Sequence, residues 1–219
     1  MPNSSQEHGH GHHGSEGIAT GWEGSQEGVA YSERNHHLAG FFVLLVGASE
    51  LLPALRVSAA NWTRLLLPGA LAAMGAFLLI WSDHQAWPIG SLSFAETFWG
   101  HDSEIQQHKT YGVLSLTVGL IEVLRRQDRM VHAAWTAPLP LFAILGGAML
   151  FAHSHGDHPS AQQIASDHAV MGTLAISAGL AKLLSAWLSP LAGWARTKGE
   201  IVWAVFILAI GVQLLLYSE

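Results

Sequence analysis

Six apolar runs, each close to twenty residues long, dominate this chain of 219 residues. A helix needs roughly 20 apolar residues to cross the ~30 Å hydrocarbon core of a bilayer. Within lipid only helices and closed barrels satisfy their backbone hydrogen bonds, and these runs lack the two-residue alternation of barrel strands. The sequence therefore predicts an all-α polytopic membrane protein with six transmembrane helices. The expected spans are residues 37–57, 62–82, 108–126, 132–152, 167–188 and 199–217.

The first, third and fifth runs share a spaced pattern of His, Gly, Gly and an ionisable residue. A pattern that recurs at fixed spacing indicates that one structural unit was used several times. We expect three tandem hairpin repeats, 37–82, 108–152 and 167–217, arranged around a pseudo-threefold centre. The copies are His36, Gly40, Gly47 and Glu50; His108, Gly112, Gly119 and Glu122; and His168, Gly172, Gly179 and Lys182.

Basic residues are concentrated in the three short loops that join the helices within each predicted hairpin. The positive-inside rule places such loops in the cytoplasm, so both termini would face the periplasm of a bacterial inner membrane. The opposite side carries most of the acids, and an acidic external face attracts cations. The basic residues of the three loops are Arg56, Arg64, Arg125, Arg126, Arg129, Arg196 and Lys198.

Histidine is the most distinctive residue of this external face, because the predicted topology leaves only His132 of the 14 histidines on the cytoplasmic side. Neutral imidazole is the commonest metal ligand in proteins and suits copper, zinc, nickel and iron. The chain has no cysteine, which excludes thiolate ligands. The expected metal ligands are His36, His108 and His168, supplemented by His153, His155 and His158.

Two methionines lie near these histidines in the sequence. Met149 precedes His153 by four residues and Met171 follows His168 by three, so each pair shares a helix face. A thioether beside imidazole would suit Cu(I). Packing against lipid or another helix is the alternative role for both methionines.

The two regions outside the apolar runs differ in character. Residues 1–36 are rich in Gly, Ser, Glu and His, and we expect them to form a disordered periplasmic tail. Residues 83–107 carry four aromatic side chains, which predicts a segment at the outer membrane interface with a short helix begun by Ser91 or Ser93. The tail histidines that could gather metal loosely are His8, His10, His12 and His13. An incidental histidine tract is the alternative.

Each repeat has an ionisable residue 14 positions after its histidine, about 21 Å further along a helix. Charges within a membrane are costly, face the bundle interior and pair with one another. We therefore expect a cluster of Glu50, Glu122 and Lys182 near the cytoplasmic end. Such a cluster is either a structural ion network or part of an ion or proton path.

Three stretches carry a resemblance to a known family. In residues 107–122, residues 146–155 and the helix from Trp203 to Tyr217, the chain resembles the membrane domain of copper resistance protein D-like proteins. The likeness covers the second half well and the first half only in helix pattern. It implies an inner-membrane protein that handles copper at its periplasmic face, for uptake or resistance, with a periplasmic copper-binding protein as a partner.

Other functional classes are less consistent with the sequence. The chain has no phosphate-binding loop, no nucleophile elbow and no basic nucleic-acid face, so we expect neither enzyme activity nor a nucleic-acid partner. The alternative to copper handling is an electron-transfer protein whose paired histidines hold haem b. Haem requires histidines that face each other inside the bundle, whereas most of these are predicted at or above the membrane boundary.

Overall fold

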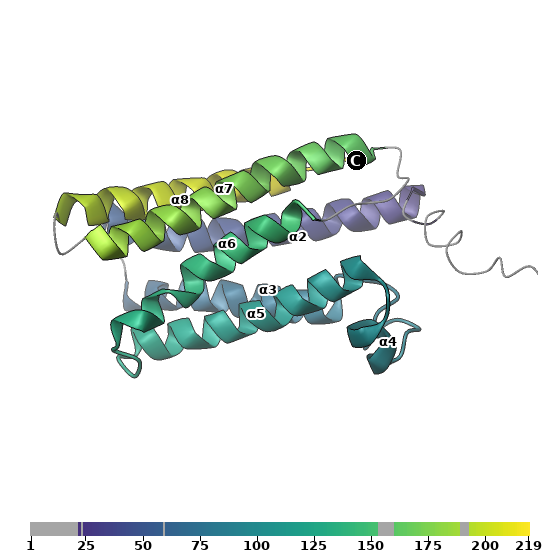
Figure 1. The fold of residues 1–219 in the computed structure, drawn as a ribbon, viewed down its shortest axis with the longest axis horizontal. Helices are drawn as coiled ribbons and strands as arrows, with labels where there is room; N and C mark the ends of the chain where they lie inside the picture. The colour runs from purple at the N-terminus through teal and green to yellow at the C-terminus, as the bar shows by residue number, and fades with distance from the viewer. Residues whose placement is uncertain (1–21, 23, 59, 153–159, 189–192) are drawn as a thin grey trace, which may run out of the picture.

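The computed structural model describes Trp22 and residues 24–58, 60–152, 160–188 and 193–219 (Figure 1). These described residues form helices and connecting turns, and no strand occurs among them. The long helices lie side by side, while a short helix, α4, lies outside the bundle at one end. The α-helices are α2 (Gln26–Ala54), α3 (Leu66–Ile80), α4 (Phe94–Trp99), α5 (Ser103–Arg126), α6 (Pro138–Leu150), α7 (Ala161–Leu188) and α8 (Gly193–Leu215). Two 3₁₀ helices are η1 (Asn61–Leu65) and η2 (Ala133–Thr136).

By length and composition, five helical stretches of the described chain could cross a membrane, which is the pattern of a multi-pass membrane protein. The predicted third span is the exception. It corresponds to α5, which has 24 residues but contains Lys109, Glu122, Arg125 and Arg126. These charges lower its apolar character, so the six-span prediction is supported for five helices. The five stretches are Gln26–Ala54, Trp62–Ile80, Ala133–Leu150, Ala161–Trp187 and Arg196–Leu215.

Helix α2 begins well inside the segment predicted to be a disordered tail, residues 1–36, and this boundary was therefore placed too late. The Ser25 side chain caps the helix by accepting a hydrogen bond from a backbone N–H of the first turn. Tyr31 and Asn35 then donate hydrogen bonds to backbone carbonyls at the end of α3, with 3.0 Å between Asn35 Nδ2 and the Ser82 oxygen. Polar contacts of this kind leave no signal in a hydropathy pattern.

The short helix predicted within residues 83–107 is confirmed as α4. Ser93 is its N-cap and forms a capping box with Glu96. The Glu96 amide donates to Ser93 Oγ at 3.2 Å, and the Ser93 amide donates to Glu96 Oε2 at 2.8 Å. Helix α5 begins soon afterwards at Ser103, where Asp102 caps its first turn, so the end of the predicted interfacial segment is helical.

The first glycine of each repeat copy packs against a glycine of another helix. A Cβ atom at these positions would lie only 2.7–3.1 Å from the facing carbonyl oxygen, so any side chain would force the helices apart. Small residues allow this close backbone approach in membrane bundles. The contacts join α2 to α8, α5 to α3, and α7 to α6. They are Gly40 with Gly211, Gly112 with Gly75, and Gly172 with Gly147.

These glycine contacts pair the helices differently from the predicted hairpins. The predicted units, 37–82, 108–152 and 167–217, would join α2 with α3, α5 with α6, and α7 with α8. The close glycine contacts instead join α2 to α8, α3 to α5 and α6 to α7. The tandem-hairpin arrangement is therefore not confirmed, because spacing along the chain does not determine which neighbouring helix a glycine contacts.

Replacing Gly147 by alanine is expected to destabilise the protein, because the new Cβ would lie 2.5 Å from the Gly172 carbonyl oxygen. Overpacking of this kind costs about 1–3 kcal/mol and should lower the melting temperature in detergent. The matched control is Gly69→Ala, because a Cβ at Gly69 meets nothing within 4 Å. Equal melting temperatures for the two variants would contradict the packing role of Gly147.

Candidate functional site

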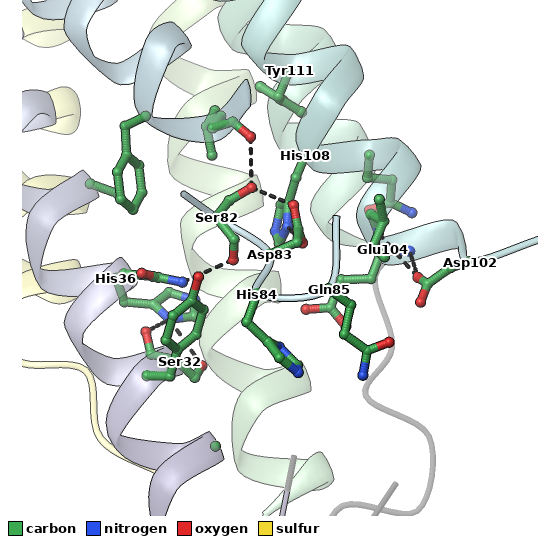
Figure 2. A pocket seen from close by; sticks show the side chains of 18 of the residues that line it. Ser32, His36, Ser82, Asp83, His84, Gln85, Asp102, Glu104, His108 and Tyr111 are labelled. Carbon is green, nitrogen blue, oxygen red and sulfur yellow. Dashed lines mark hydrogen bonds and ion pairs between the residues drawn. The ribbon is translucent and has the colours of Figure 1, made fainter. Parts of the chain in front are cut away.

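A cavity of about 240 Å³ lies at the end of the bundle near α4 (Figure 2). Four of the residues predicted to bind metal line it: His36 of α2, His108 of α5, Met149 of α6 and His168 of α7. We call this end of the bundle the histidine end. Residues far apart in the sequence therefore meet here, because each histidine lies at an equivalent level of its own helix.

His36 and His168 are neighbours in this cavity. Their ring centroids are 6.2 Å apart with a tilt of 31°, and His168 is buried. His36 Nδ1 lies 2.9 Å from the Ser32 carbonyl oxygen, and the Tyr217 ring stacks on the imidazole at 3.9 Å. Histidines that bind metals usually donate their second ring N–H to a carbonyl or carboxylate, which fixes the ring and directs the other nitrogen to the ion. His36 has this contact.

His108 is held by a carboxylate. Its Nδ1 lies 2.7 Å from Asp83 Oδ1, and the second oxygen of Asp83 lies 2.8 Å from Lys109 Nζ. Lys109 is almost fully buried and also donates to the Leu78 carbonyl at 3.0 Å. Figure 2 shows Asp83 and His108 in contact beside the cavity. Asp83 therefore orients His108 and neutralises the buried ammonium group.

The pKa of Asp83 reflects two opposing effects. Burial raises the pKa, but the hydrogen bond with His108 and the positive charges of His108 and Lys109 outweigh it and hold the pKa below its ordinary value. Asp83 is thus an anion at neutral pH. In the neighbouring His84, burial lowers the pKa more than the Asp83 charge raises it, so this imidazole is neutral.

The remaining charges around the cavity are acidic. Asp102, Glu104 and Glu219 line it together with Asp83, whereas no Lys or Arg lines it within the described part of the chain. Carboxylates that surround a cleft concentrate cations near it. The cavity lining therefore carries an excess of carboxylates.

The structure does not bring together all the predicted ligands. Met171 is packed in the apolar core, one turn deeper than His168, and does not line the cavity. Within the described ranges, no group of three or more His, Asp or Glu side chains is arranged to hold a metal ion. His36, His108, His168 and Met149 therefore share the lining of one cavity without forming such a group. The other predicted residues, His8, His10, His12, His13, His153, His155 and His158, lie outside the described residues.

The predicted ionisable residues lie at the opposite end of the bundle, which we call the arginine end. Glu50 accepts hydrogen bonds from Lys182 Nζ at 2.6 Å and from Arg126 Nη2 at 2.8 Å. Arg126 Nε also lies 3.2 Å from Glu122, so Glu122 joins the network through an arginine. Lys182 has a second carboxylate partner in Glu200, at 2.6 Å. The structure thus places all three predicted residues in one network.

Sequence reasoning missed several members of these two clusters. Arg126, the last residue of the expected third span, was counted with the basic loop residues, although its position four residues after Glu122 is the spacing of a helical ion pair. Asp83 was counted among the external acids, and no feature of the sequence links it to His108, 25 positions later. Contacts between separate helices require the tertiary structure.

Together, the apolar helices and the cavity define a multi-pass membrane protein with a histidine-lined cavity at one end. In comparisons with known proteins, no family model, no curated protein and no solved structure matched the chain. The resemblance to copper resistance protein D-like proteins therefore stays a prediction.

Proposed function

We propose that this protein binds copper ions at the periplasmic face of a bacterial inner membrane. The observation that carries the proposal is the convergence of His36, His108, His168 and Met149, from four different helices, on one acidic cavity. Imidazole nitrogen combined with thioether sulfur favours Cu(I), whereas Mg²⁺ and Ca²⁺ prefer oxygen ligands. The ligand chemistry therefore supports copper more than a hard cation.

The hydrogen bonds made by the Nδ1 atoms of His36 and His108 support the same proposal. The Ser32 carbonyl positions His36, and the Asp83 carboxylate positions His108. A carboxylate or carbonyl on the remote ring nitrogen is typical of histidines that bind metals, because it fixes the tautomer and increases the basicity of the ligand.

The proposed topology uses six membrane spans, with α5 as the third. Arg64, Arg125 and Arg126 lie at the arginine end, which we assign to the cytoplasm by the positive-inside rule. The histidine end and both termini then face the periplasm. From this side a periplasmic copper-binding protein could deliver the ion.

The haem alternative is supported less well by the cavity. Its volume of about 240 Å³ lies below the roughly 300–1,000 Å³ of pockets that hold drug-sized ligands. The bundle is also closed by direct glycine contacts between helices, which leave little room for a macrocycle between them. An ion with a few waters suits this space better.

The test of this proposal is the metal content of the full chain, purified in detergent from cells grown with added copper. We expect copper in a fixed ratio to protein and no Soret band in the absorption spectrum. Titration of the metal-free protein with Cu(I) and Cu(II) should show tighter binding of Cu(I). A Soret band would favour the haem alternative, and absence of copper binding in both titrations would overturn the proposal.

A further inference from the structure

Exposed tryptophans gather at two levels of the bundle. Three lie at the histidine end, at the end of α3, in the turn before α4 and in α4 itself, and four lie at the arginine end, in η1 and η2 and at the adjoining ends of α7 and α8. Each of the seven is at least 39% exposed. Tryptophan is enriched at both membrane–water boundaries, where its ring lies among the lipid headgroups. The first group is Trp81, Trp87 and Trp99, and the second is Trp62, Trp135, Trp187 and Trp194.

The distance between the two tryptophan groups matches a bilayer, because Trp62 of η1 is 19 residues from Trp81 at the end of α3, about 28 Å at 1.5 Å per residue. Along α7, Trp187 is 19 residues from His168, which corresponds to about 28 Å at 1.5 Å per residue. Along α8, Trp194 is also 19 residues from Gln213, whose amide donates to the Asp167 carbonyl at 3.2 Å. Two neighbouring helices therefore reach polar residues at the same height. This height is close to the ~30 Å thickness of the hydrocarbon core.

The segment around α4 presents an aromatic surface that the rest of the protein leaves uncovered. Trp99 is 71% exposed and Phe94 is 47% exposed. Phe94 contacts both Trp87 and Trp99, with ring centroids 5.4 and 5.5 Å apart. The opposite face of α4 is turned inward, because Thr97 is fully buried and its Oγ1 accepts a hydrogen bond from the Trp87 amide at 2.9 Å. Gln106 of α5 donates a hydrogen bond to the Gly100 carbonyl directly after α4, which ties the segment to the bundle. The exposed surface is therefore held in place and directed outward.

The position of α4 agrees with a membrane surface. Figure 1 shows it beside the ends of α3 and α5, outside the bundle, rather than over its end. The connection from α3 to α5 thus extends laterally, into the space that surrounds the bundle. For a protein with membrane-spanning helices, this space at the height of a tryptophan group is the headgroup layer.

We propose that residues 81–102, here called the collar, lie in the lipid headgroup region of the leaflet at the histidine end, with Trp99 and Phe94 inserted among the lipids. Phospholipid is the proposed occupant of this aromatic surface, because the second tryptophan group lies one bilayer thickness away. Asp83, His84 and Gln85 belong to the collar and line the cavity. The cavity therefore opens at the level of the headgroups. This inference does not depend on copper.

The test uses the absence of native cysteine to attach one fluorophore at a chosen position. Ala95 is exposed on α4 next to the aromatic surface, so Ala95→Cys places an environment-sensitive dye there with a small change of side chain. The labelled full chain is reconstituted in phosphatidylcholine vesicles with lipids that carry a quencher either near the headgroup or deep in the acyl chain. We expect a larger loss of emission with the shallow quencher than with the deep one.

Two matched positions calibrate the depth. Val205 is exposed in the middle of α8, so a dye on Val205→Cys should be quenched mainly by the deep quencher. Arg129 is exposed in the loop after α5, so a dye on Arg129→Cys should respond to aqueous iodide and to neither lipid quencher. Ser91→Cys, also exposed in the collar, is a second reporter if Ala95→Cys fails to fold.

Two outcomes would overturn the proposal. Quenching of the collar dye by iodide alone would place the collar in water. Protection from iodide and from both lipid quenchers would indicate that protein, such as a second copy of the chain, covers the aromatic surface. Because no metal is added, either outcome leaves the copper proposal unaffected.

Discussion

Copper binding is expected to be lost when His36 and His168 are both replaced by alanine. The two rings are 6.2 Å apart in the cavity, and their removal would leave Met149 and His108. Changes to residues that merely support a ligand typically reduce metal affinity about 10–100-fold, so loss of two ligands should exceed 100-fold. Competition titration with Cu(I) at fixed pH, on detergent-purified protein, measures this effect. His108→Ala with His168→Ala should have a similar result.

The matched control for this experiment is His132→Ala. His132 is exposed in the turn before η2, at the arginine end, so the same substitution there should leave copper affinity unchanged. Circular dichroism and the elution volume of each variant show whether the fold is intact. Unchanged copper affinity in a folded His36→Ala, His168→Ala variant would remove the main support for the copper proposal.

Replacing Glu50 is expected to have the largest effect on stability. Its carboxylate is 11% exposed and holds both Lys182 and Arg126, which come from different helices. After Glu50→Ala, Glu200 would be the remaining carboxylate partner of Lys182, and Glu122 that of Arg126. Breaking a buried ion pair by removing one partner costs about 3–5 kcal/mol, because an uncompensated charge remains buried. Thermal unfolding in detergent should show a lower melting temperature.

Glu27→Ala is the control for the same change on the same helix. Glu27 is exposed in the first turn of α2, where its charge contributes less than about 1 kcal/mol through the helix dipole. If Glu50→Ala and Glu27→Ala lowered the melting temperature equally, the network at the arginine end would not stabilise the bundle. A restored melting temperature in Glu50→Asp would show that the charge itself is required.

The comparison of α2 and α4 shows where sequence patterns are informative. The sequence predicted the short helix α4 with Ser91 or Ser93 at its start, and the structure selects Ser93, which forms a capping box with Glu96. The first turns of α2 were not predicted from the sequence, because their residues form no apolar stripe. Tyr31 and Asn35 instead form hydrogen bonds with the end of α3. Local patterns therefore identified local structure, and contacts between distant segments left no comparable signal.

Hydropathy and residue spacing predicted five helices that are long and apolar enough to cross a membrane, together with the level of each key residue along its helix. His36 and Glu50 must lie about 21 Å apart along one helix, because the rise per residue is constant. Only the tertiary structure decided the lateral order of the helices, and with it the partners of these residues: Asp83 beside His108, and Arg126 beside Glu50. The physical reason is that an apolar helix can pack against several neighbours, and the choice depends on close contacts such as that of Gly40 with Gly211.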